Sequence, residues 1–250
     1  MRRFKDRPQA GTALAARLAA YAGRADVLVL ALPRGGVPVG HALARALGVE
    51  LDVLVVRKLG MPHHPEWAMG AIGNGGVLVL QPGVPGLMGV TQADVDAACA
   101  REGAELRRRE LAYRGTQAPL DLAGRTVILV DDGVATGSTM LAAIGVARRL
   151  GAHVLVLAVP VAPPETLAVL APRVDELVCL SAPLRFRAVG EWYDAFDQTS
   201  DKEVQELLAS AHGARGGGEP RNPTTGGAKH DADLQDWPGK RMDEPRGRRP

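Results

Sequence analysis

The chain contains 250 residues, of which 46% are hydrophobic and 23% are charged, and this composition suits one α/β domain of ordinary size with appendages. Aromatic residues make up only 4%, so we expect a core of Val, Leu and Ala, which disfavours an all-β sandwich. The formal net charge is +2, and residues 1–212 are neutral with 22 basic and 22 acidic side chains, which argues against a basic nucleic-acid-binding surface.

Signals for export, disulfides or membrane insertion are weak. Cys99 and Cys179 are the only cysteines and lack the short spacing of a metal site, and no apolar segment follows the charged N-terminus. The longest apolar stretches, such as residues 154–162, are shorter than a membrane span. We therefore expect a cytoplasmic protein without a disulfide framework or a membrane segment.

The N-terminal part contains a helix pattern, a strand pattern and a second helix pattern. Residues 6–23 predict a covering helix, and residues 27–32 predict the first buried strand. Residues 33–36, Pro-Arg-Gly-Gly, follow this strand, and a second helix is predicted from residue 39 to 47. Two glycines there let the backbone approach an anion, and Arg34 suits a diphosphate. A tight turn with a solvated arginine is the alternative.

Two cations follow the second predicted strand. Residues 51–56 predict this strand, and Arg57 and Lys58 come directly after it. Two positive charges at the carboxyl end of a strand suit a diphosphate site. Solvated surface charge is the alternative for both residues.

The next segment predicts a projecting hairpin and a long helix. Gly73 to Gly76 separate two apolar runs within residues 67–90, which is typical of a β-hairpin. Metal ligation or acid–base work is conceivable for His63 and His64, but no further His or Cys lies at ligand spacing, so we expect an exposed loop. Residues 91–113 predict a polar helix whose length indicates an insertion outside the core.

Residues 127–140 carry the most specific pattern in the chain. An apolar strand leads directly into Asp131 and Asp132, and a short loop with small hydroxyl residues then opens a helix. Ligands of parallel sheets bind beyond the carboxyl ends of strands, so the two acids reach the binding edge. Carboxylates suit ribose hydroxyls or a magnesium-bearing face, whereas the amides and hydroxyls of residues 135–139 suit a phosphate. An ordinary strand-to-helix turn is the alternative.

The C-terminal part completes the sheet and adds an aromatic cluster. Strands are predicted at residues 154–161 and 176–180, and five apolar strands alternating with helices indicate an α/β fold with a doubly wound, mostly parallel sheet, whose strand order stays open. Trp192, Tyr193 and Phe196 follow the last strand and suit either a platform for a planar base or a cap on the core. Residues 213–250, with eight Gly and five Pro, predict a disordered tail.

These motifs together resemble the type I phosphoribosyltransferases. Residues 127–139 are similar to the family signature for 5-phosphoribosyl 1-diphosphate (PRPP), namely an apolar strand, two acids, a short variable segment and Thr-Gly-x-Thr. Residues 33–36 resemble the diphosphate loop, and residues 57–62 resemble the Arg-Lys-x-Gly-x-Pro stretch of adenine members. The resemblance covers residues 1–212 and implies a flap hairpin with an inserted helix at about 62–115 and a C-terminal hood at about 184–198.

The resemblance implies an enzyme that transfers ribose 5-phosphate from PRPP to a nitrogenous base and releases diphosphate. Mg²⁺ would be bound indirectly, through Asp131, Asp132 and PRPP, the other partners would be small molecules, and a homodimer stays open. The implied catalytic residues are Arg34, Lys58, Asp131 and Asp132, the diphosphate site comprises Arg34, Gly35, Gly36, Arg57 and Lys58, the phosphate site comprises Ala135, Thr136, Gly137, Ser138 and Thr139, and the base site comprises Trp192, Tyr193 and Phe196.

One departure from the family pattern leaves the acceptor open. Ala135 stands where 6-oxopurine members carry an acid, which is closer to the adenine type, so neither acceptor is carried over. A catalytically silent module that senses PRPP or a nucleotide is the alternative from another class of function. A nicotinamide-binding Rossmann enzyme is disfavoured, because no G-x-G-x-x-G follows the first strand.

Overall fold

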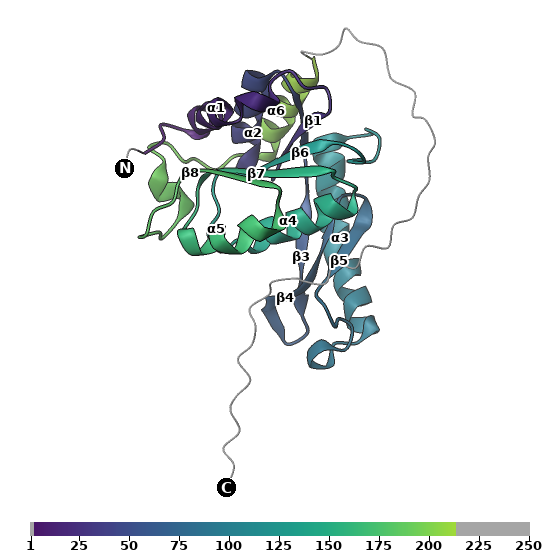
Figure 1. Ribbon diagram of the computed structural model, residues 1–250. Helices are drawn as coiled ribbons and strands as arrows, with labels where there is room; N and C mark the ends of the chain where they lie inside the picture. The colour runs from purple at the N-terminus through teal and green to yellow at the C-terminus, as the bar shows by residue number, and fades with distance from the viewer. Residues whose placement is uncertain (1–2, 214–250) are drawn as a thin grey trace.

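The computed structural model describes residues 3–213, and its centre is a five-stranded parallel sheet (Figure 1). The strand order is β2-β1-β6-β7-β8, which confirms the predicted fold class and supplies the order that the sequence left open. The central strands β1, β6 and β7 are nearly continuous runs of apolar residues, as expected where helices cover both faces of a sheet. Their bounds are β1 Val27–Ala31, β2 Glu50–Val53, β6 Thr126–Val130, β7 Val154–Val161 and β8 Glu176–Ser181.

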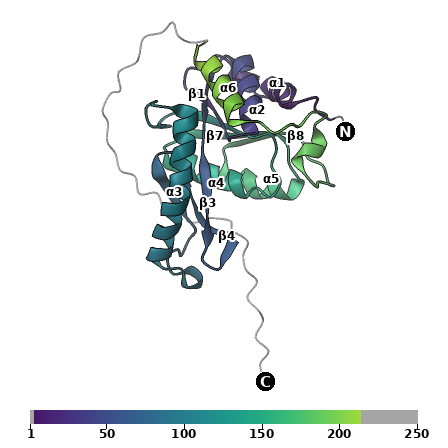
Figure 2. The ribbon, with the colours of Figure 1, turned by 180° about the vertical axis from the view of Figure 1, so that it is seen from behind.

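The helices of the body form one layer on each face of this sheet (Figure 2). Alternate strand residues divide the core into two clusters: Val29 and Ile128 point to one layer, whereas Leu30 and Leu129 point to the other. The first layer contains α1 Arg7–Arg17, α2 Gly36–Leu47 and α6 Asp201–Gly213, and the second contains α4 Ser138–Arg149 and α5 Pro164–Leu170. Helix α2 begins at Gly36, the last residue of the glycine loop, three residues earlier than the sequence predicted.

A smaller subdomain projects from this body (Figure 1). It consists of an antiparallel sheet in the order β3-β4-β5 and the long helix α3 Gln92–Arg114. The strands are β3 Val56–Met61, β4 His64–Gly73 and β5 Val77–Leu80, and the pairing of β4 with β5 confirms the predicted hairpin. The root of this sheet packs tightly on the body, because a Cβ on Gly73 would overlap the side chain of Val146 in α4.

Two boundaries differ from the prediction. The strand predicted at residues 51–56 is divided between two sheets, because its hydrogen bonds change partner: the Leu54 amide donates to Ala31 O at 3.0 Å, and the Val55 amide donates to Asn74 Oδ1 at 2.6 Å. The chain thus leaves the parallel sheet and enters the antiparallel one. Helix α3 is also part of the core rather than a mere insertion, because its side chains Val95 and Leu106 are fully buried.

Short 3-10 helices connect some of the larger elements of the described chain. No helix within residues 3–213 has both the length and the apolar character needed to cross a membrane. The predicted tail at 213–250 lies outside the described residues, apart from Gly213, which ends α6. The 3-10 helices are η1 Ala19–Tyr21, η2 Asn74–Gly76, η3 Leu87–Gly89, η4 Ala171–Arg173 and η5 Val189–Trp192.

Candidate active site

Two adjacent carboxylates lie where β6 ends at the carboxyl edge of the parallel sheet. Asp131 Oδ1 accepts a hydrogen bond from the Asp132 amide at 2.8 Å. Burial raises the pKa of the Asp131 carboxyl well above its ordinary value, and the neighbouring charge of Asp132 adds to this rise. Burial also raises the pKa of Asp132, although the guanidinium of Arg7 beside it opposes the rise. Ionising both carboxyls is therefore unfavourable in the free protein, and the pair lies at the edge where ligands of such sheets bind.

The loop after the acids is held open at the N-terminus of α4. Gly137, at φ +78°, forms the last residue before the helix, and Ala135, Thr136 and Thr139 are exposed. The hydroxyls of Thr136 and Ser138 lie 3.2 Å apart. The structure thus brings the five predicted phosphate-binding residues together at a helix N-terminus, where free amides and the helix dipole favour an anion.

The loop that precedes α2 lies directly against the two acids. A Cβ on Gly35 would overlap Asp132 Oδ2, and a Cβ on Gly36 would lie 3.1 Å from Asp131 Oδ1. A residue with a Cβ would have to displace the carboxylate, so glycine is what lets the predicted diphosphate loop lie in contact with the predicted ribose acids. Arg34 in this loop has a side chain that is 37% exposed and lies 3.7 Å from Asp201 at the start of α6, whose carboxylate also accepts the Tyr113 hydroxyl at 2.6 Å.

The structure corrects the predicted place of Arg57 and Lys58. Both lie inside β3 in the projecting sheet rather than in a loop after β2. Arg57 donates from Nε and Nη2 to Glu102 Oε2 of α3, at 3.0 and 2.7 Å, and the Lys58 side chain is exposed opposite Ala71. Within residues 3–213, no hydrogen bond or ion pair joins either side chain to the Asp131 loop. Their role in binding diphosphate stays a prediction.

The aromatic cluster after β8 divides into buried and accessible rings. Tyr193 is only 3% exposed, and its hydroxyl donates to the Asp132 carbonyl oxygen at 2.6 Å. Burial raises the pKa of this phenol. A ring at this depth cannot stack on a ligand, so the structure corrects that prediction: Tyr193 caps the core and supports Asp132. Trp192 is half-buried and Phe196 is 36% exposed, and their role in base binding stays a prediction.

Arg7 is a site residue that sequence reasoning missed. Its Nε donates to Asp132 Oδ2 at 2.8 Å, its Nη1 donates to the Asp197 carbonyl at 2.7 Å, and its guanidinium carbon lies 3.9 Å from the centre of the Phe196 ring. One signal could have found it. A cation in the first turn of a helix opposes the helix dipole, so Arg7 at the start of α1 needs an acidic partner.

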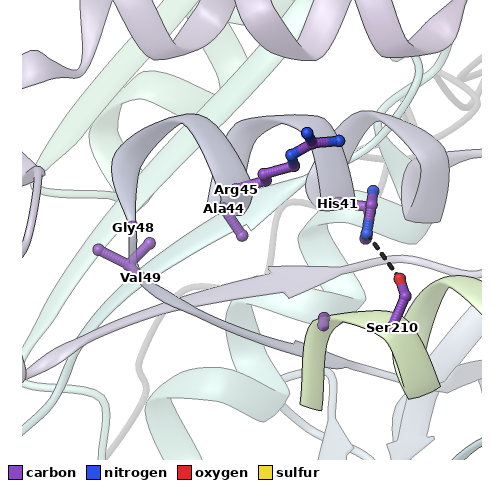
Figure 3. Close-up of a pocket in the computed structure, with 7 residues that line it drawn as sticks. His41, Ala44, Arg45, Gly48, Val49 and Ser210 are labelled. Carbon is purple, nitrogen blue, oxygen red and sulfur yellow. Dashed lines mark hydrogen bonds between the residues drawn. The ribbon is translucent and has the colours of Figure 1, made fainter. Parts of the chain in front are cut away.

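Two cavities of the described chain lie away from these loops. A cavity of about 490 Å³ separates the C-terminal halves of α2 and α6, where His41 Nε2 lies 2.9 Å from Ser210 Oγ (Figure 3). A second, of about 240 Å³, lies at the end of the projecting sheet beside His63 and His64, which are exposed as expected. Among residues 3–213 no three His, Cys, Asp or Glu side chains gather in a metal-binding arrangement.

Comparisons with known proteins agree with this arrangement. The family model described as "Phosphoribosyl transferase domain" matches residues 3–185, and the chain belongs to this family. "Putative phosphoribosyl transferase Rv0571c" of Mycobacterium tuberculosis is 49% identical over 212 residues, which are 85% of this chain and 48% of that protein. The crystal structure of TT1426 from Thermus thermophilus is 46% identical, with a TM-score of 0.77, and the match covers 84% of this chain and 99% of that one.

The matches cover most of this chain but only part of its curated relatives. The chain spans about half the length of the curated relatives that it matches, 48% in each case. The family and the α/β fold with its parallel sheet are thereby established, and the resemblance read from the sequence is confirmed.

Proposed function

We propose that this chain transfers the 5-phosphoribosyl group from PRPP to a nitrogenous base and releases diphosphate. The observation that carries the proposal is the close approach of Gly35 and Gly36 to Asp132 and Asp131. This approach joins a diphosphate-type loop, a pair of acids and a phosphate-type loop into a single site, in the order that PRPP itself presents its diphosphate, ribose and 5-phosphate. Cytoplasmic location and small-molecule partners belong to the same proposal.

Each part of the site has a chemical task in this reaction. The bond from C1 of the ribose to the diphosphate oxygen breaks, and a bond from C1 to a nitrogen of the base forms. Positive charge grows on the ribose ring, which the carboxylates of Asp131 and Asp132 stabilise, and negative charge grows on the leaving diphosphate, which Arg34 and the loop amides stabilise. The loop from Ala135 to Thr139 fixes the 5-phosphate, so catalysis rests chiefly on placement.

The donor set at this edge fits a magnesium ion that arrives with the substrate. Mg²⁺ prefers oxygen ligands and is commonly bound through one or two carboxylates together with substrate phosphates. Asp131 and Asp132 would supply the carboxylates, and PRPP would supply further oxygen ligands. Such an ion would neutralise the diphosphate.

The acceptor base is the open part of the proposal. Trp192 and Phe196 are the rings of the cluster that retain exposed surface and could stack on a base, which is worth ~1 to 3 kcal/mol per ring. A catalytically silent PRPP sensor is the second candidate, and one observation favours it. Arg7 forms an ion pair with Asp132 at 2.8 Å, so one of the two acids has a cation partner before any ligand binds.

The experiment that separates the two functions measures binding and turnover on the same protein. Purified full-length protein is titrated calorimetrically with PRPP and MgCl₂, and diphosphate release is then followed with a panel of purine, pyrimidine and other nitrogenous bases. A transferase releases diphosphate with at least one base. PRPP binding without release on any base supports the sensor, and a lack of PRPP binding contradicts both.

A further inference from the structure

We propose that Arg7 is a positioning residue that locks the hood onto Asp132, so that the start of the chain and the hood together form one lid over the ribose end of the site. The effect of Arg7 on PRPP binding rests on the proposed function. The lock, meaning the contacts by which Arg7 joins the hood to Asp132, does not rest on it. The hood is residues 184–198, as defined from the sequence. Three structural observations support the lock.

The first observation is the set of partners that one side chain joins. Arg7 is 9% exposed, and its guanidinium contacts the Asp132 carboxylate, the Asp197 carbonyl and the Phe196 ring. Asp132 belongs to the PRPP-type loop, whereas Phe196 and Asp197 belong to the hood. The planar guanidinium uses separate nitrogens for the two oxygens and its face for the ring, which a lysine ammonium cannot reproduce.

The second observation is a backbone ribbon next to Arg7. The Phe4 amide donates to the Trp192 carbonyl at 2.9 Å, the Asp194 amide donates to the Phe4 carbonyl at 2.8 Å, and the Ala195 amide donates to the Lys5 carbonyl at 3.0 Å. The ring of Phe4 also packs on Tyr193, with centroids 5.6 Å apart. Residues 4–7 and the hood are therefore one connected unit, and Arg7 is its charged link to the site.

The third observation is the asymmetry between the two acids. Asp132 Oδ2 lies against both Arg7 Nε and the backbone of Gly35, and Tyr193 holds the carbonyl of the same residue. Within residues 3–213, Asp131 has no cation at ion-pair distance. We infer that Asp132 is the fixed anchor between lid and diphosphate loop, which leaves Asp131 as the acid available to ribose hydroxyls.

Hydrogen exchange tests the lock without any ligand. The amides of Asp194 and Ala195 report the ribbon, and the amides of β6 and β7 report the intact sheet. Arg7→Ala should speed exchange at the ribbon by about tenfold or more while the sheet amides stay protected, because the ribbon opens locally. Arg17→Ala is the matched control, since Arg17 is exposed at the other end of the same helix.

A conservative variant separates charge from geometry and guards against misfolding. Arg7→Lys keeps a cation near Asp132 but loses the second nitrogen and the flat face, so it should retain the fold and still show faster ribbon exchange than the wild type. Wild-type exchange rates at Asp194 and Ala195 in both Arg7 variants would overturn the lock. Faster exchange in Arg17→Ala of the same size would also overturn it.

A double-mutant cycle on PRPP tests the route through Asp132. Arg7→Ala, Asp132→Asn and the double variant are titrated with PRPP and MgCl₂. If Arg7 acts through Asp132, the Arg7→Ala/Asp132→Asn double variant should bind PRPP no more weakly than whichever of the two single variants binds it less tightly. In a second cycle, Arg7→Ala combined with Asp131→Asn should lower the PRPP affinity by the product of the two single-variant fold-losses. Multiplied losses in the first cycle would contradict the route. A wild type that fails to bind PRPP would remove the proposed function alone, and the exchange result would still decide the lock.

Discussion

Similar sequence patterns have different outcomes at the carboxyl edge of the parallel sheet and in the projecting sheet. In both regions an apolar run is followed by charged residues that the sequence assigned to one site. In the parallel sheet, Ala31 is aligned with Val130, so the segments that follow β1 and β6 start level and meet. In the projecting sheet, Arg57 is part of a strand and points to Glu102 of α3. Charged residues after an apolar run therefore predict a ligand site only when the run is a strand that ends at the carboxyl edge of the parallel sheet.

The largest expected effect tests the acids of the carboxyl edge. Asp131→Asn with Asp132→Asn should weaken PRPP binding by several kcal/mol in total, at ~1.5 to 3 kcal/mol per charge-assisted hydrogen bond. Calorimetric titration with MgCl₂ measures the loss, and circular dichroism checks that the double variant is folded. An unchanged affinity in the folded double variant would remove the ribose assignment from this edge.

A glycine pair compares steric fit in the two regions. Gly35→Ala places a methyl group on the Asp132 carboxylate, so we expect a loss of about 1–3 kcal/mol in the free energy of unfolding from overpacking, together with weaker PRPP binding. A Cβ on Gly103 in α3 would meet the flexible end of Arg107 at 3.3 Å and Ile72 Cδ1 at an ordinary contact distance of 3.8 Å, so Gly103→Ala should stabilise the protein by up to about 1 kcal/mol. Urea unfolding measures both changes. Equal tolerance at both positions would mean that the two loops do not need their close approach.

Two arginines sharpen the same comparison through charge. Arg34→Ala should weaken PRPP binding by ~1.5–3 kcal/mol if its guanidinium contacts the diphosphate. Arg57→Ala should leave the affinity nearly unchanged and lower stability by only about 0–1 kcal/mol, because its ion pair with Glu102 is partly exposed. Calorimetry on both variants decides the matter. A similar loss of affinity in Arg57→Ala would bring the projecting sheet back into the diphosphate site, as the sequence predicted.

The smallest effect concerns the stability of the free protein. The folded state raises the pKa of Asp131, so it holds the proton more tightly than the unfolded chain does, and ionisation costs folding free energy. This cost is absent below the ordinary carboxyl pKa and grows as the pH rises toward the raised value. Asp131→Asn should therefore raise the melting temperature at pH 7, by ~2–4 °C per kcal/mol, and the gain should vanish in acid. A lower melting temperature at pH 7 would contradict the burial cost.

Local patterns predicted the fold and the centre of the site because each depends on a short stretch of chain. An apolar strand, two acids and a Thr-Gly-Ser-Thr loop define their own geometry, so Asp131 to Thr139 could be placed without knowing the rest of the protein. The helix-start signal at Arg7 indicates an acidic partner but not which one, and neither the pairing of Arg7 with Asp132 nor the burial of Tyr193 could be predicted, since both depend on how α1 and the hood pack together. The strand predicted at residues 51–56 was wrong for a related reason: the hydrogen-bond partner changes from Ala31 to Asn74 between Leu54 and Val55, and both residues are equally apolar.

Thr166 in the first turn of α5 has a consequence for how quickly a ligand is captured. Its hydroxyl donates to the Ala135 carbonyl at 2.6 Å, and its methyl group would lie 2.9 Å from a Cβ on Gly137. The Val134 amide is fixed as well, by the Val161 carbonyl at 2.9 Å. Fixing one backbone residue costs ~1–2 kcal/mol of conformational entropy, and folding has already met that cost for this loop. The loop is thus ordered before a phosphate binds. Diffusion and electrostatic attraction, rather than loop ordering, should therefore govern the association rate of the phosphate.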